Sequence, residues 1–135
     1  MILLTFFGCS SDPEIPSKIG IPVKKVHNEN FSILILGDSL TEGYGVGTEQ
    51  AFPHLLEKKL NTEFFFDNNC SYQVINAGIS GSTTSGGVSR IEWLLKSKPN
   101  FLIIALGGND GLRGVPIEET KRNLEKIILA AQVKN

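Results

Sequence analysis

The sequence is poor in the residues that form metal or disulfide frameworks. Its 135 residues include two cysteines and two histidines, too few for a cysteine-rich zinc scaffold or for a domain held together by disulfides. Long apolar runs are also missing, since none reaches the roughly 18 residues that span a bilayer. Neither sign of charge is in excess, because 13 Lys and Arg stand against 14 Asp and Glu, so nucleic-acid binding is not favoured. With 41% hydrophobic residues and no short repeat, the chain is typical of one globular domain.

The first 28 residues differ from the rest of the chain. An apolar stretch, MILLTFFG, leads into Cys9, and a polar segment with three prolines follows. This pattern resembles a bacterial lipoprotein signal, in which the cysteine carries acyl chains that hold the protein on a membrane. The stretch before Cys9 is short and lacks Lys and Arg, so an unmodified N-terminus with an incidental cysteine is the alternative. We expect residues 1–28 to be a signal and tether and residues 29–135 to be the domain. We also expect the protein to be exported and anchored through a lipidated Cys9 on the periplasmic or surface side of a bacterial membrane.

Three short apolar runs, each closed by a glycine, predict β-strands over residues 31–36, 72–77 and 101–106. Runs without regular polar alternation are typical of strands buried on both faces of a parallel sheet. Amphipathic stripes after these runs predict three helices. The order strand–helix, repeated three times, predicts an α/β sandwich with right-handed crossovers.

The helices are expected where apolar residues recur every three or four positions, over residues 52–60, 88–95 and 117–131. The last helix reaches the end of the sequence, where a fourth strand would begin. A sheet of three parallel strands is smaller than the usual four to six. The run over residues 101–106 carries neither charge nor proline, so nothing in it discourages pairing at an open edge. We therefore expect a three-layer sandwich that is incomplete at its C-terminal end.

The loops after the three strands carry the residues from which chemistry is expected. Ser39 follows the first strand in Gly-Asp-Ser-Leu, Gly81 follows the second, and Asn109 follows the third in Gly-Gly-Asn-Asp. Because the carboxyl ends of parallel strands share one edge of the sheet, these residues can converge. A serine hydroxyl on a tight turn is a candidate nucleophile. The backbone amides of Ser39 and Gly81, with the Asn109 side chain, can stabilise a tetrahedral oxyanion, so the pattern favours acyl transfer.

Each of these motifs taken alone is an ordinary turn, because capping serines, glycines and asparagines are common in loops. Their conjunction, each motif after a strand, is what favours catalysis. Nucleotide binding is not supported, because the glycines at 43, 45 and 47 miss the G-x-G-x-x-G spacing and no G-x-x-x-x-G-K-[ST] occurs. The α/β-hydrolase elbow G-x-S-x-G is also absent, since Thr41 stands where it needs a glycine.

The strings ILGDSLTEGYGV, VINAGISGSTTSGG and LGGNDGLRG resemble blocks one, two and three of the SGNH (GDSL-type) hydrolases. They are similar to the subgroup of acyl-CoA thioesterases, lysophospholipases and arylesterases, over about residues 31–133. The resemblance implies a flavodoxin-like sheet, the nucleophile Ser39, and an oxyanion hole that includes Gly81 and Asn109. It implies hydrolysis of small acyl esters or thioesters through an acyl-enzyme, with no metal or cofactor. Ser82 stands where relatives often carry Asp, and we expect little effect.

The general base is the large departure from this family. The resemblance implies a base in a late Asp-x-x-His block, yet none of the four aspartates of the chain has a histidine three residues later. His27 lies in the tether. His54 lies at the start of the first helix, where a partly exposed surface position is the simpler interpretation. We expect the sequence to stop before the base, which severely impairs turnover; the alternative is an inactive remnant or one that only binds acyl or carbohydrate ligands.

Overall fold

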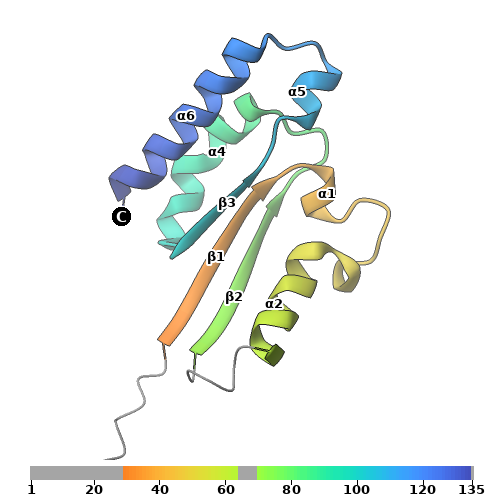
Figure 1. Ribbon diagram of the computed structural model, residues 1–135, viewed down its shortest axis with the longest axis vertical. Coiled ribbons are helices and arrows are strands. Elements are labelled where there is room, and N and C mark those ends of the chain that lie inside the picture. Colours follow the sequence, from red (N-terminus) through yellow and green to blue (C-terminus); the bar gives the residue numbers. More distant parts are fainter. Residues whose placement is uncertain (1–28, 64–69, 135) are drawn as a thin grey trace, which may run out of the picture.

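The computed structural model describes residues 29–63 and 70–134, so the predicted signal, the tether and Cys9 lie outside the described residues. The described chain forms one sheet with helices on both faces (Figure 1). The strands are β1 (Glu29–Gly37), β2 (Cys70–Gly78) and β3 (Phe101–Ala105). The helices are α1 (Ser39–Glu42), α2 (Phe52–Glu63), α4 (Thr84–Leu94), α5 (Gly108–Leu112) and α6 (Ile117–Lys134), with short 3-10 turns η1 (Thr48–Gln50) and η2 (Leu95–Ser97).

The strand order is β2-β1-β3, and both pairings are parallel. The central strand β1 pairs Ile33 with Val74 of β2 and with Phe101 of β3. The predicted parallel α/β sheet is confirmed, with β3 as the expected edge strand. Strands β1 and β2 begin two residues earlier than predicted, because the parallel ladder already starts at the pair Glu29 and Cys70.

The main core lies between the sheet and the two helices α4 and α6, which share one face of the sheet (Figure 1). Its buried centre consists of Leu36, Ile91, Leu95 and Ile127. Burying one side chain of this size contributes about 1.5–3 kcal/mol relative to leaving it exposed. The apolar stripes predicted over residues 88–95 and 117–131 therefore supply this core.

Helix α2 covers the opposite face beside β2 (Figure 1). Asn61 fixes the helix to the strand, because its side chain both donates to the carbonyl of Tyr72 (2.8 Å) and accepts from the N–H of Tyr72 (2.9 Å). The predicted stripe is less buried than expected: Phe52 is 41% exposed and Leu55 is 49% exposed. The reason is that α2 lies over one edge of a narrow sheet, so part of its stripe faces no other described element.

The chain comes very close to itself at the carboxyl end of β2. A Cβ placed on Gly78 would lie 2.1 Å from the backbone nitrogen of Glu42 and 2.6 Å from the carbonyl carbon of Thr41. Backbone atoms cannot turn aside as a flexible side chain can, so a larger residue must push β2 and α1 apart. Glycine at this position therefore keeps the loops after β1 and β2 side by side.

Gly78→Ala is expected to lower the free energy of unfolding by about 3 kcal/mol or more, because it overpacks a contact between backbone segments. Gly111→Ala is the matched control, since a Cβ there would meet nothing within 4 Å and alanine is the better helix former. Urea unfolding followed by circular dichroism compares both variants with the native chain. Native stability of Gly78→Ala would contradict the close approach.

Candidate active site

Ser39 is the first residue of α1 and follows β1 after a single intervening residue. That residue, Asp38, caps the helix, because its Oδ1 accepts a hydrogen bond from the N–H of Leu40 at 3.0 Å. Such a cap stabilises a helix start, where the first N–H groups have no partner within the helix. The helix ends after one turn at Gly43, whose φ of 93° is left-handed. The local sequence thus holds Ser39 at the carboxyl edge of the sheet.

The loop after β2 brings Gly81 to the same edge. Its φ of 74° lies in the region that favours glycine, and its carbonyl accepts a hydrogen bond from Nη2 of Arg113 at 2.9 Å. The N–H of Gly81 donates to no acceptor among the described residues, and neither does the N–H of Ser39. Two backbone donors at this edge are therefore available to a bound oxyanion.

Asn109 lies in the first turn of α5, directly after β3 and its loop. Its Nδ2 donates to the carbonyl of Ser82 at 3.0 Å and lies 3.4 Å from Oδ2 of Asp38. The three loops therefore converge, as the sequence predicts. The second contact is long for a hydrogen bond, so one proton of the Asn109 amide remains available to a stronger acceptor.

Arg90 of α4 ties two strand ends together at this edge. Its guanidinium donates to the carbonyl of Ala77 (2.5 Å), to the carbonyl of Gly37 (2.9 Å) and to the hydroxyl of Ser82 (3.1 Å). Burial lowers the pKa of the Arg90 guanidinium from its usual value, yet an arginine stays protonated at neutral pH. Arg90 thereby sets the spacing between the loops that follow β1 and β2.

A buried polar network anchors α5. Asp110 is 1% exposed; its carboxylate accepts from the N–H of Thr84 (2.9 Å) and from the Thr84 hydroxyl (2.5 Å). The side chain of Asn123 donates to the same hydroxyl at 3.2 Å. The network connects the start of α4, α5 and α6. Because Asp110 follows Asn109 in the chain, the network also fixes the backbone that carries the Asn109 amide.

The sequence analysis does not identify Arg90 or the role of Asp110. Asp110 had a usable signal, since it belongs to the Gly-Gly-Asn-Asp motif and follows Asn109 directly. No sequence signal points to the role of Arg90, because two of its acceptors lie 13 and 53 positions away along the chain. Contacts of that kind exist only after the helix has packed on the sheet.

The GDSL-like Lipase/Acylhydrolase family model matches residues 35–135. The chain belongs to this family. The solved structure of AlinE4, an SGNH-hydrolase family esterase, superposes with a TM-score of 0.70 at 40% identity and covers 79% of this chain and 56% of AlinE4. The crystal structure of TesA gives a TM-score of 0.68 at 38% identity, covering 76% of this chain and 55% of that one. The predicted SGNH hydrolase fold is thereby confirmed.

Curated relatives of this GDSL-family chain have names from the same class of chemistry. Esterase TesA of Pseudomonas aeruginosa is 38% identical over 104 residues, which are 76% of this chain and 49% of the relative. Thioesterase 1/protease 1/lysophospholipase L1 of Escherichia coli K12 is 38% identical over 105 residues, 77% of this chain and 47% of the relative. The chain spans about half the length of these relatives.

The described part of this GDSL-family chain contains one histidine, His54. Its Nε2 lies 2.7 Å from Oε2 of Glu49, and both side chains are partly or largely exposed. A general base must hydrogen-bond the nucleophile and must itself be oriented by a third group. His54 is instead paired with Glu49 at the start of α2, which agrees with the surface position expected from the sequence. His27 lies outside the described residues.

Within residues 29–63 and 70–134, no three His, Cys, Asp or Glu side chains lie close enough together to hold a metal ion. No helix in this part of the chain is long and apolar enough to cross a membrane. The side-chain amide of Asn109 lies at the same sheet edge as Ser39, beside the carboxylate of Asp38, and amide donors of this kind stabilise negative charge on oxygen.

Proposed function

We propose that this domain carries the nucleophile and oxyanion hole of a carboxylic ester or thioester hydrolase of the GDSL family. One observation carries the proposal: the unpaired N–H groups of Ser39 and Gly81 lie at the same sheet edge as the Asn109 amide. These three donors come from three loops, and donors held in place before reaction cost no reorganisation when charge develops.

The proposed reaction has two steps. The hydroxyl oxygen of Ser39 attacks the acyl carbon while its proton passes to a base, and the N–H groups of Ser39 and Gly81 with the Asn109 amide bind the oxyanion that forms. The bond to the leaving alcohol or thiol then breaks, the leaving group takes up a proton, and the acyl group remains on Ser39. Water attacks the acyl carbon in the second step and releases the acid with a restored serine.

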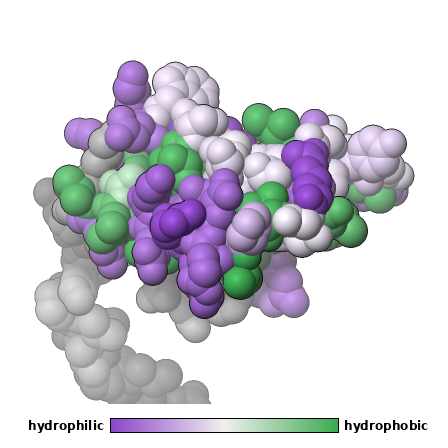
Figure 2. All heavy atoms as spheres, turned by 90° about the horizontal axis from the view of Figure 1, so that it is seen from above, coloured by the Kyte–Doolittle hydropathy of each residue, from purple (hydrophilic) through white to green (hydrophobic). Residues whose placement is uncertain are grey.

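Exposed apolar side chains around the nucleophile support an acyl substrate. Leu40 is 80% exposed, Ile79 52% and Leu112 87%, and each lies in the segment after a strand that also carries Ser39, Gly81 or Asn109. Figure 2 looks onto this end of the molecule and shows hydrophobic side chains interspersed with polar ones. A hydrocarbon chain laid across such a surface removes apolar area from water, which contributes roughly 25 cal/mol per Å².

A remnant that binds ligands without turnover is the second candidate. The pairing of His54 with Glu49 favours it, because no base contacts Ser39 within the described residues. Both candidates share the oxyanion hole but differ in covalent chemistry, so detection of an acyl group on Ser39 separates them.

The test uses p-nitrophenyl butyrate and intact-mass spectrometry of the chain. We expect slow formation of a single butyryl adduct on the peptide that contains Ser39. The adduct accumulates because deacylation also needs a base. Asn109→Ala is expected to slow its formation by about 10²–10³-fold, as loss of one oxyanion donor does. Asn100→Ala, at the opposite end of β3, is the matched control. An adduct that forms as fast in Asn109→Ala as in the native chain would count against this oxyanion hole.

We also propose that Cys9 is lipidated and holds the domain at a membrane surface, on the pattern MILLTFFG-Cys. Two or more acyl chains give stable attachment, whereas one chain gives only marginal binding. Mass spectrometry of the protein from its native host is expected to find an acylated Cys9 at the mature N-terminus. An intact, unmodified Met1 would exclude lipidation.

A further inference from the structure

A tight turn after β2 carries the N–H group of Gly81. The turn spans residues 79–82 and is closed by a hydrogen bond from the N–H of Ser82 to the carbonyl of Ile79 at 3.0 Å. The φ of Gly81 is 74°, whereas the φ of Ser80 is not positive. A positive φ at the third residue alone is typical of a type II turn. The peptide between Ser80 and Gly81 is therefore the central unit of a type II turn.

The orientation of this central peptide decides which group the turn presents to a substrate. Type I and type II turns differ at the ψ of the second residue and the φ of the third, so the central peptide is turned over between them. One orientation directs the N–H of Gly81 to a given side of the turn, and the other directs the carbonyl of Ser80 there. Only the N–H can stabilise an oxyanion, so the oxyanion hole needs the turn to be held in one form.

Glu42 of α1 holds the first half of the turn. Its Oε2 accepts a hydrogen bond from the N–H of Ser80 at 2.8 Å and a second one from the Ser80 hydroxyl. Hydrogen bonds to an ionised acceptor are stronger than those between neutral groups, and here both the main chain and the side chain of Ser80 are held. Because Glu42 ends the helix that Ser39 begins, its carboxylate ties the turn to the helix of the proposed nucleophile.

The backbone that carries Glu42 is itself fixed. The N–H of Glu42 donates to the carbonyl of Asp38 at 2.9 Å, and the carbonyl of Thr41 accepts from Nδ2 of Asn76 on β2 at 2.8 Å. Within the described residues the carboxylate of Glu42 forms no ion pair. The hold on Ser80 is therefore the contact that this side chain makes from a rigid base.

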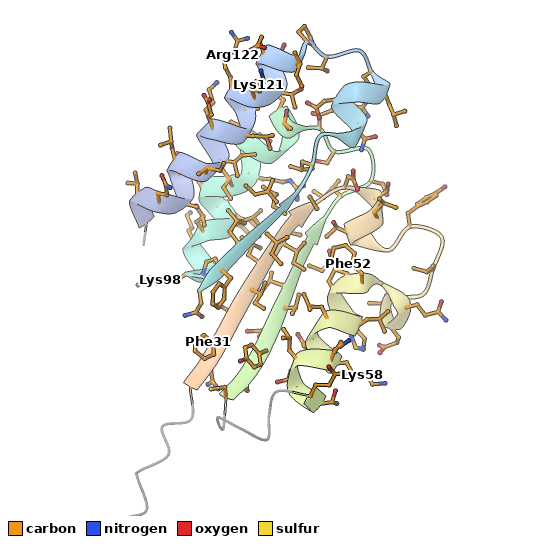
Figure 3. All side chains as sticks on the ribbon, in the orientation of Figure 1. Phe31, Phe52, Lys58, Lys98, Lys121 and Arg122 are labelled. Atoms are coloured by element: carbon orange, nitrogen blue, oxygen red, sulfur yellow. The ribbon has the colours of Figure 1, made fainter. Side chains whose placement is uncertain are left out.

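The second half of the turn is held from the opposite side. Arg113, the residue after α5, donates from Nη2 to the carbonyl of Gly81 at 2.9 Å. Figure 3 shows α1 and α5 on the two sides of the loop that follows β2. A carboxylate and a guanidinium thus hold the two central residues of the turn. Neither takes up the N–H of Gly81, which donates to no acceptor among the described residues.

We propose that Glu42 is a positioning residue of the oxyanion hole, which keeps the turn over residues 79–82 in its type II form and so keeps the N–H of Gly81 directed at the acyl oxygen. The inference rests on the proposed function, because it concerns the same oxyanion hole. A direct electrostatic effect has the opposite sign, since a carboxylate bound to the residue before Gly81 disfavours negative charge on the acyl oxygen. Removal of Glu42 slows acylation if the carboxylate positions the turn, and speeds acylation if only its charge acts.

The test measures acylation of the full chain by p-nitrophenyl butyrate, followed by intact-mass spectrometry. Glu42→Ala is expected to lower the limiting rate of acylation by about tenfold, less than the 10²–10³-fold that loss of a donor costs. The ester concentration that gives half of this rate is expected to stay the same, because the oxyanion forms only as the transition state is reached. Glu42→Gln keeps an acceptor oxygen for the N–H of Ser80, so we expect its rate to lie within about threefold of the native rate.

Ser80→Ala tests the same contact from the turn. It removes the hydroxyl contact and leaves the N–H contact, so we expect a loss of about threefold. The double variant is expected to lose no more than Glu42→Ala alone, because the hydroxyl of Ser80 acts through Glu42. Glu125→Ala is the matched control, since Glu125 is an exposed glutamate of α6, and it is expected to leave the rate unchanged. Circular dichroism checks that each variant keeps its fold.

Amide hydrogen exchange, measured by NMR, reports on the turn without any reaction. The N–H of Ser80 is expected to exchange about tenfold faster in Glu42→Ala than in the native chain, because its acceptor is lost. Acylation of Glu42→Ala at the native rate or faster would overturn the positioning role, and so would equal exchange at Ser80 in both chains. Absence of an adduct on the native chain would instead overturn the proposed function, and the exchange rates would still decide whether Glu42 holds the turn.

Discussion

Ser39→Ala is expected to abolish covalent labelling of the chain by a fluorophosphonate. The same change is expected to lower the initial rate of p-nitrophenol release from p-nitrophenyl butyrate to the level found without protein. The reason is that Ser39 is the proposed nucleophile, whereas the hydroxyl of Ser80 donates to Glu42 and that of Ser82 accepts from Arg90, and an oxyanion hole alone retains only a small part of catalysis. Gel-based labelling and initial-rate measurements give the two readouts.

Ser85→Ala serves as the control for this change. Ser85 is an exposed serine of α4, so its loss should alter neither labelling nor rate. Circular dichroism distinguishes a chemical effect from unfolding, since Ser39 is only half-buried and makes no side-chain contact that the fold needs. Equal labelling of Ser39→Ala and the native chain would rule out Ser39 as the nucleophile.

Asp110→Ala is expected to lower the free energy of unfolding by about 2–4 kcal/mol. The substitution leaves the buried N–H and hydroxyl of Thr84 without their acceptor, and each unsatisfied buried polar group costs about 1–3 kcal/mol. Urea unfolding measures the change. Asp110→Asn keeps the size of the side chain and one acceptor oxygen, which can still accept from the N–H of Thr84 while the amide Nδ2 faces the Thr84 hydroxyl, so we expect a smaller loss in the same direction.

Glu118→Ala is the matched control for Asp110. Glu118 pairs with Lys121 at 3.0 Å on the surface of α6, and exposed pairs of this kind contribute about 0–1 kcal/mol. We expect Asp110→Ala also to slow acylation of Ser39, because the network positions the backbone of Asn109. A variant with native stability would show that the buried contacts of Asp110 are dispensable.

The convergence of Ser39, Gly81 and Asn109 could be predicted because it depends on one rule of topology. Parallel strands place their carboxyl ends at one edge, so residues three or four positions after three predicted strands must lie near one another. Burial of Leu36 followed from a continuous apolar run, which is typical of a strand covered on both faces, and burial of Ile127 followed from an apolar stripe, which marks the face of a helix that packs inward.

The exposure of Phe52 and Leu55 could not be predicted. An apolar stripe shows which side of a helix tends to be buried, but what covers that side depends on the number of neighbouring elements. The sheet has three strands, and α2 lies over one edge of it. Phe101 is exposed for a related reason, because its strand is an edge and the helix that covers β2 does not reach it.

The amino-acid order alone determined the family, the succession of strands and helices, and the three loops from which the chemistry is expected, because these features are written in short, contiguous patterns. Only the folded chain showed that Arg90 bridges two strand ends, that Asp110 anchors α5, and that His54 is engaged by Glu49. The physical reason is the separation of these partners along the chain. A hydrogen bond between residues far apart in the sequence depends on helix packing and strand order, and neither of these leaves a local sequence pattern.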